Sequence, residues 1–184
     1  QSGASFRVHS EREDMYKAIQ SEKWDYIILQ GYSRELTHPV DYIDTATIPF
    51  LNKIVDSVYS NNPLTNILFY HTWGYENGFE EDSTVNTYDK MTDQIRYGYM
   101  YLGELFNAPV VPVGQVWRQV RESSDIDLYA PDRAHPSRNG SFLIATTFYN
   151  AIFSQSTARV YTKTIDSDTA DVIKKVATEF ITNH

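Results

Sequence analysis

Short apolar runs alternate along this chain with longer segments in which apolar residues recur every three or four positions. The runs lie at 26–29, 67–70 and 109–113, and each is bounded by turn-forming or polar residues. Their length and composition are typical of strands buried on both faces of a parallel sheet. Because helical patterns lie between these strands, the sequence predicts an α/β fold: a three-layer α/β/α, flavodoxin-like domain with a parallel sheet.

The helical segments show recognisable starts and apolar stripes. Ser10 followed by Glu13 is a capping-box pattern and predicts the start of a helix. Pro49 is predicted in the first turn of another helix, since proline is tolerated at that position. We predict the remaining helices over 85–106, around Trp117, over 142–153 and around Val176.

The number of strands is small for the length of the chain. Three strands are visible in 184 residues, whereas sheets usually have about four to six. We therefore expect one or two further strands, including a central one, to precede Gln1. On this interpretation, residues 1–184 form a single domain that lacks its N-terminal strand or strands.

Composition narrows the class of partner. A formal charge of −8 argues against nucleic acid and against anionic membrane surfaces, because both require a basic face. No apolar run approaches the roughly 20 residues that cross a bilayer. The chain has no cysteine, which excludes disulfides, thiolate catalysis and cysteine-bound zinc. Its 14 tyrosines suit a sugar-binding cleft, although half-buried packing would use them equally well.

The segment with the clearest chemistry is Asp132-Arg133-Ala134-His135-Pro136. It places a carboxylate three residues before an imidazole, in a proline-bounded turn that leads into a helix. In such a turn the Asp can accept a hydrogen bond from one ring nitrogen and leave the other as a general base. A solvated Asp–His pair is the alternative interpretation of the same spacing.

Three other polar segments follow directly after predicted strands. They are Gln30-Gly31, His71-Thr72-Trp73 and Val113-Gly114-Gln115. Ligands of parallel α/β sheets bind beyond the carboxyl ends of the strands. The sequence therefore predicts a site at this edge of the sheet, over which the Asp132–His135 turn could fold.

These residues resemble the SGNH (GDSL-type) hydrolase superfamily, and in particular a bacterial branch related to carbohydrate O-acetyl esterases. Asp132 and His135, with the segment 136–145 behind them, match the last block of the family. Residues 24–30 are similar to the third block of that branch, and residues 2–6 to the second. The similarity covers roughly residues 1 to 155.

The resemblance implies a serine esterase that removes acetyl or similar acyl groups from a carbohydrate without a cofactor. His135 would be the general base and Asp132 its orienting acid. The Gln30 amide and the Gly3 N–H would donate to the oxyanion, although Gln30 could equally cap a strand and Gly3 could be a loop glycine. Ser5 has the letters Gly-x-Ser around it but no preceding strand, so we expect the nucleophile upstream of this chain.

Several further interpretations stay open. His71, Trp73 and Tyr32 could line the substrate pocket, while a packing role for Trp73 and a surface position for His71 are the alternatives. A metal bound by Asp132, His135 and His71 has no supporting ligand spacing. The competing functions are a carbohydrate-binding protein that keeps the fold without a nucleophile and, more weakly, a flavodoxin-like cofactor protein. The resemblance also implies an exported bacterial protein.

Overall fold

The structure is a computed structural model, and it describes residues 3–154, 162 and 164–183. The chain forms two compact units. Unit 1 consists of Gln1–Tyr70 and Gln94–Val110, and unit 2 consists of His71–Asp93 and Val111–His184. The prediction of a single domain stays a prediction, and each unit is described separately below.

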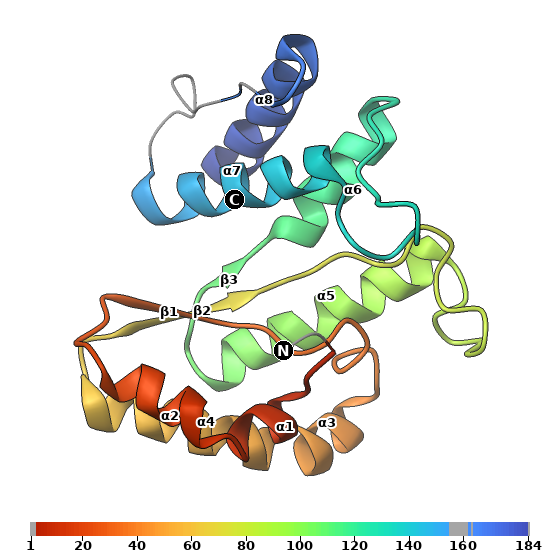
Figure 1. Ribbon diagram of the computed structural model, residues 1–184. Helices are drawn as coiled ribbons and strands as arrows, with labels where there is room; N and C mark the ends of the chain where they lie inside the picture. Colours follow the sequence, from red (N-terminus) through yellow and green to blue (C-terminus); the bar gives the residue numbers. More distant parts are fainter. Residues whose placement is uncertain (1–2, 155–161, 163, 184) are drawn as a thin grey trace. The chain divides into compact units, whose positions relative to one another are not determined.

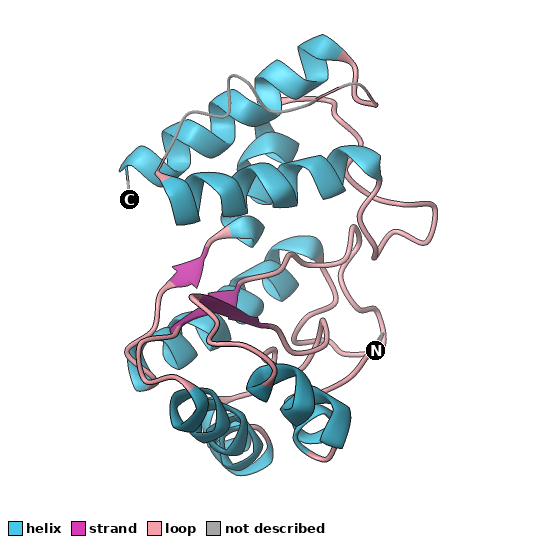
Figure 2. Ribbon diagram, turned by 60° about the vertical axis from the view of Figure 1, so that its left-hand side comes forward, coloured by secondary structure: helices cyan, strands magenta, loops and turns pink. Residues whose placement is uncertain are grey.

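A parallel sheet of three short strands, in the order β1-β2-β3, lies at the centre of the topology. The strands are β1 (Tyr26–Leu29), β2 (Asn66–Tyr70) and β3 (Val110–Val111). β1 and β2 pair in parallel, with Ile28 opposite Leu68. On the other side of β2, the N–H of Phe69 donates to the carbonyl of Pro109, and the N–H of His71 donates to the carbonyl of Val111. Donor and acceptor both move two residues forward along the chain, as they do in a parallel pair. Figure 2 shows how short these strands are beside the helices.

Unit 1 places helices beside β1 and β2. They are α1 (Phe6–Ser10), α2 (Glu13–Gln20), α3 (Val40–Ala46) and α4 (Ile48–Asn61). α4 packs against the other three, and its apolar stripe is buried at Leu51, Ile54 and Val58. Figure 1 shows α1 to α4 grouped on one side of the β1–β2 pair. The predicted first-turn proline of this helix is confirmed, because Pro49 lies within its first two positions.

The longest helix, α5 (Tyr88–Leu105), has the predicted apolar stripe. The five stripe residues, Tyr88, Met91, Ile95, Tyr99 and Leu102, are all buried. Their interval of three or four residues places them on one helical face. The core interpretation of this stripe is therefore confirmed.

Unit 2 is built around α6 (Val113–Ser123), α7 (Arg138–Phe153) and α8 (Ser167–Asn183), which pack against one another in all three pairs. Trp117, Leu143 and Ile173 are fully buried, one from each helix. α7 begins close to the α6 core, since a Cβ on Gly140 would lie 2.6 Å from the Trp117 ring. Glycine at this position allows that approach.

Three details of the helix and strand predictions are wrong. Ser10 ends α1 instead of starting a helix: its hydroxyl donates to the Arg7 carbonyl, and α2 begins after Arg12 without a side-chain cap. The third strand is limited to Val110–Val111, because α6 begins at Val113. α7 begins at Arg138, four residues before its predicted start, with Ser137 as its N-cap. The helices α1 and α3 were not predicted, since each is too short to show a full apolar period.

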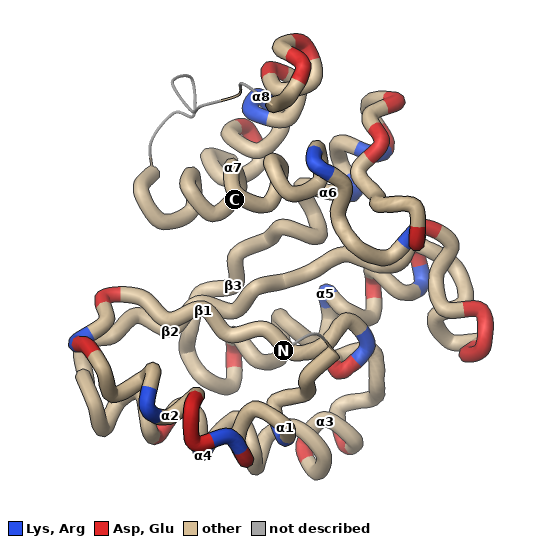
Figure 3. The backbone as a smooth tube through the Cα atoms, in the orientation of Figure 1, with Lys and Arg blue, Asp and Glu red and all other residues tan. Residues whose placement is uncertain are grey.

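The predicted fold class, an α/β fold with a parallel sheet and flanking helices, is confirmed. Charged side chains are absent from β1, β2 and β3 and lie on helices and loops (Figure 3). Among the described residues, no helix combines the length and apolar character that a membrane crossing requires.

Candidate active site

The turn Asp132–His135 in unit 2 is organised around the Asp132 carboxylate. Its Oδ1 accepts from the backbone N–H groups of Ala134 at 3.0 Å and His135 at 2.9 Å. Its Oδ2 lies 2.6 Å from Nδ1 of the His135 ring. Three contacts from within three residues thus hold the carboxylate in one orientation. The pair is open to solvent, with the His135 and Asp132 side chains 70% and 53% exposed.

These contacts determine which ring nitrogen of His135 carries the proton. The backbone N–H of His135, then that of Ala134, and then the His135 ring lower the pKa of Asp132 to about 2. The group is therefore an ionised carboxylate near neutral pH, and a carboxylate can only accept hydrogen bonds. Nδ1 must donate to it. In the neutral ring, Nε2 is then the acceptor, as a general base requires.

The backbone of the turn is strained and is anchored by neighbouring segments. Arg133, between the acid and the base, has a φ of 60°, in the left-handed region that disfavours non-glycine residues. Its carbonyl accepts from the N–H of Glu76 at 2.9 Å. The next carbonyl, that of Ala134, accepts from the indole Nε1–H of Trp73 at 3.1 Å. These two bonds hold the turn in a conformation that its own sequence does not favour.

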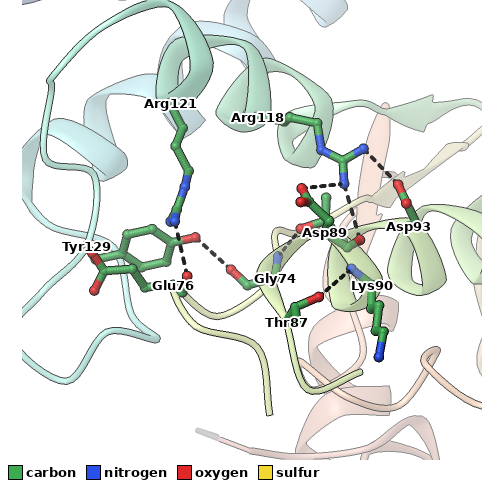
Figure 4. Close-up of polar contacts among 10 residues, drawn as sticks. Gly74, Glu76, Thr87, Asp89, Lys90, Asp93, Arg118, Arg121 and Tyr129 are labelled. Carbon is green, nitrogen blue, oxygen red and sulfur yellow. Dashed lines mark hydrogen bonds and ion pairs between the residues drawn. The ribbon is translucent and has the colours of Figure 1, made fainter. Parts of the chain in front are cut away.

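An aromatic cluster lies beneath these anchors. Trp73 stacks on Trp117 with a centroid separation of 4.1 Å and an interplanar angle of 3°, and Tyr129 meets Trp117 edge-on at 5.0 Å. The Tyr129 hydroxyl donates to the Gly74 carbonyl at 2.7 Å (Figure 4). The backbone of Tyr129 also bridges to Pro136, just after the catalytic candidate. The cluster therefore connects the segment after β2 to both sides of the turn.

Further polar contacts position Glu76, whose backbone N–H binds the Arg133 carbonyl. The Arg121 guanidinium donates to the Glu76 carbonyl at 3.1 Å and lies 4.2 Å from the centre of the Tyr88 ring. Figure 4 shows this contact beside Arg118, which binds the Asp93 carboxylate at 2.7 Å. These bonds extend the support of the turn to the surface of α6.

Unit 2 also contains a cavity of about 260 Å³. Its lining consists of Glu76, Arg121, Tyr129 and the segment Ser124–Leu128. Two further carboxylates, Asp125 and Asp127, belong to that segment. The lining thus combines charged groups with an aromatic ring, which suits a polyhydroxylated ligand better than a long acyl chain.

His71 and Trp73, which the sequence offers as pocket residues, are both buried in unit 2. Trp73 is 9% exposed and has the packing and anchoring position described above. His71 is 1% exposed. A Cβ added at Gly114 would lie 2.7 Å from its Nε2, so the ring packs against that glycine. The surface position considered for His71 does not occur, and a role for either side chain in substrate contact stays a prediction.

The remaining candidates belong to unit 1. Gln30 is exposed and follows β1 directly, as expected from the sequence. Gly3 is exposed and has a φ of 68°, a conformation that suits glycine. Tyr32 is half-buried, and its carbonyl accepts from the N–H of Glu35. Ser5 caps α1, because its hydroxyl accepts from the N–H of Val8 at 3.2 Å. Ser2, the first residue of the segment that resembles the second family block, lies outside the described residues.

Sequence reasoning missed Glu35, a buried carboxyl group in the loop after β1. It is 4% exposed, and its two oxygens lie 2.9 and 3.0 Å from the backbone nitrogen of Phe6. No periodicity or known motif marks it. The only signal is its place four residues after Gly31, close to the predicted oxyanion residue Gln30.

The described residues contain no group of three or more metal-ligating side chains placed to hold an ion. Asp132 and His135 form a pair without a third ligand from His, Asp or Glu in that part of the chain.

Among comparisons with known proteins, the one with solved structures finds proteins of the same fold. No family model matches the chain, and no curated protein does. A DUF4886 family protein from Bacteroides uniformis is similar in structure, with a TM-score of 0.81 and 22% identity over 98% of this chain and 80% of that one. A protein from Slackia heliotrinireducens classed as an SGNH hydrolase has a TM-score of 0.61 and 22% identity, over 79% and 78%.

A catalytic mutant of an acetylxylan esterase from Geobacillus stearothermophilus is also similar. Its TM-score is 0.53 and its identity 20%, over 81% of this chain and 68% of that one. At such identities the similarity shows a shared fold. The Asp132–His135 pair thus lies on a fold that this chain shares with these three solved structures.

Proposed function

We propose that this protein is a serine esterase that removes O-acetyl or similar small acyl groups from a carbohydrate. The observation that carries the proposal is the 2.6 Å contact between Asp132 and His135 in an anchored turn. An ionised acid that fixes the imidazole tautomer is the arrangement that activates a hydroxyl nucleophile. The shared fold with SGNH-type hydrolases supports an esterase in general.

In this mechanism, a serine on a segment that precedes Gln1 attacks the ester carbonyl. His135 Nε2 takes the serine proton and then gives it to the leaving sugar oxygen, so that an acyl-enzyme forms. Water then attacks the acyl carbon: His135 Nε2 takes a proton from the water and gives it to the serine oxygen, so that the carboxylic acid leaves and free serine is restored. The Gln30 amide and the Gly3 N–H are proposed to bind the oxyanion, and each such donor contributes about 3 kcal/mol.

The proposed carbohydrate specificity rests on the cavity of unit 2. Its carboxylates would accept hydrogen bonds from sugar hydroxyls, and Tyr129 would pack against a face of the sugar ring. One solved structure with this fold is an acetylxylan esterase, which makes acetylated xylo-oligosaccharides a suitable first substrate. We also propose an exported bacterial protein, which cell fractionation would test.

The test uses the full-length protein, including the residues before Gln1. Hydrolysis of p-nitrophenyl acetate and of acetylated xylo-oligosaccharides is compared between wild type, His135→Ala and His38→Ala. We expect His135→Ala to lose at least about 10³-fold in kcat. His38, whose ring lies against Tyr42, is the control and should keep full activity. Full activity in His135→Ala would refute the acid–base assignment.

The alternative function is a carbohydrate-binding protein without catalysis, which the same polar cavity would support. It predicts that the full-length protein binds xylo-oligosaccharides in calorimetry but hydrolyses neither ester. It also predicts that a fluorophosphonate leaves every serine unlabelled. Labelling of one serine upstream of Gln1 favours the esterase.

A further inference from the structure

The loop after β1 contains a carboxyl group that contacts a distant segment of unit 1. Glu35 is 4% exposed, and both of its oxygens face the single backbone N–H of Phe6, at 2.9 and 3.0 Å. Phe6 is the first residue of α1 and lies three residues after Gly3. A side chain from one loop thus holds the backbone of the other.

The same carboxyl group also packs against the residue that follows Gln30. A Cβ on Gly31 would lie 2.3 Å from Glu35 Oε2 and 3.2 Å from the Phe6 ring. Gly31 has no Cβ, and this allows Glu35 and Phe6 to lie against its backbone. Three residues that are far apart in sequence therefore form one buried contact, between the segment of Gly3 and the segment of Gln30.

We propose that Glu35 is a positioning residue that fixes the Gly3 segment relative to the Gln30 segment, so that their two donors keep the spacing an oxyanion requires. This inference rests on the proposed function, in which Gly3 and Gln30 supply those donors. Glu35 itself does not contact the substrate. A misplacement of about 1 Å in such a pair costs on the order of 10²-fold in rate.

The contact depends on the ionisation of Glu35. Burial raises the pKa of Glu35 to about 7, against the lowering effect of the backbone N–H groups of Phe6 and Tyr32. The ionised form accepts with both oxygens, whereas the protonated form turns one of them into a donor. The other ionisable groups on these two segments are Arg7 and His9 on α1, and Tyr32, Arg34 and His38 on the loop after β1. Arg7 is paired with Glu11.

The experiment compares kcat and KM of full-length wild type, Glu35→Leu, Glu35→Gln and Glu22→Leu on p-nitrophenyl acetate. Glu22→Leu is the matched control, because it removes an exposed carboxylate from the same unit. We expect Glu35→Leu to lose about 10- to 100-fold in kcat with KM within about twofold of wild type. Glu35→Gln, which keeps one acceptor oxygen, should recover most of that loss.

The second measurement is independent of the folding of Glu35→Leu. The ratio of wild-type to Glu35→Gln kcat is followed from pH 5.5 to 8.5, since only the wild type can titrate at this position. We expect the ratio to rise as the pH passes through about 7, because an ionised acceptor binds the Phe6 N–H more strongly. A constant ratio, or a folded Glu35→Leu with wild-type kcat, overturns the inference.

The two levels of proposal fail in different ways. If His135→Ala abolishes activity while Glu35→Leu is fully active, the esterase proposal stands and the role of Glu35 is wrong. If the full-length wild type hydrolyses neither ester, the proposed function fails and the inference falls with it.

Discussion

Two carboxyl groups of this chain, Asp132 in unit 2 and Glu35 in unit 1, both accept from backbone N–H groups, and yet their pKa values shift in opposite directions. Asp132 is 53% exposed and its pKa is lowered to about 2. Glu35 is 4% exposed and its pKa is raised to about 7. Each accepts from two backbone donors, and Asp132 also accepts from the His135 ring, but for Glu35 the effect of burial outweighs that of its donors. Access to water decides it, since burial penalises the charged form.

The strongest test of this comparison removes the charge of Asp132. We expect Asp132→Asn in the full-length protein to lower kcat/KM by about 10³- to 10⁴-fold, because the amide no longer fixes the His135 tautomer. The measurement is the hydrolysis of p-nitrophenyl acetate. Asp56→Asn, which changes an exposed carboxylate on α4, is the control. A loss below tenfold would place the pair outside catalysis.

The next largest effect is the pH dependence of stability that Glu35 contributes. Its folded pKa of about 7 lies above its ordinary value of 4.5, so the folded state binds the proton more tightly than the unfolded chain. The contribution of Glu35 to the free energy of unfolding is therefore fully present below about pH 4.5 and is lost as the pH rises to about 7. At about 1.4 kcal/mol per pH unit, the loss amounts to about 3 kcal/mol.

Urea unfolding of wild type and Glu35→Gln between pH 4.5 and 8 measures this contribution. The glutamine variant should lack the fall in stability over that interval. The contribution of Asp132 to stability depends on pH in the opposite direction, because the pKa of Asp132 is lowered. This contribution is lost only as the pH falls from about 4 towards 2. Parallel curves for the two proteins would show that Glu35 titrates normally.

A smaller effect is expected from the anchor of the Asp132–His135 turn. Trp73→Phe keeps an aromatic ring on Trp117 but removes the N–H that binds the Ala134 carbonyl. We expect kcat to fall about fivefold with little change in KM, because the lost bond is worth about 1 kcal/mol and orients the base. Kinetics on the full-length variant check this, with Trp24→Phe as the matched control in unit 1. An unchanged kcat would show that the Glu76 bond alone is sufficient.

The smallest predicted effects concern the two serine caps, one in each unit. Ser5 accepts from Val8 in α1, and Ser137 accepts from Gly140 in α7. Each Ser→Ala change should cost about 0.5–2 kcal/mol, with Ser137 the larger because α7 has 16 residues and α1 has five. Thermal unfolding measures both. On the proposed function, Ser5→Ala should hydrolyse p-nitrophenyl acetate as wild type does, and a folded Ser5→Ala without this activity would identify Ser5 as the nucleophile after all.

Sequence reasoning was most effective where one local pattern determines the structure. The apolar stripe of α5, from Tyr88 to Leu102, and the Asp132–His135 spacing each lie within a short window. The turn forms its own hydrogen bonds between residues that are at most three positions apart. Local chemistry of this kind can be predicted from residue types alone.

The supports of that turn could not be predicted in the same way. Trp73 binds a carbonyl 61 positions away, and Glu35 binds an N–H 29 positions away. Neither residue type specifies such a partner, which only the fold brings near. Ser10 shows the converse error, because its capping-box letters were outweighed by the end of α1.

The parallel indole rings beneath the turn give this protein a built-in optical probe. Trp73 and Trp117 are both buried in unit 2, whereas Trp24, the third tryptophan, is 40% exposed in unit 1. Emission from the shielded pair should lie at shorter wavelength than emission from the solvated ring. Fluorescence recorded at two wavelengths during denaturation would therefore follow the loosening of each half of the chain separately, without any added dye.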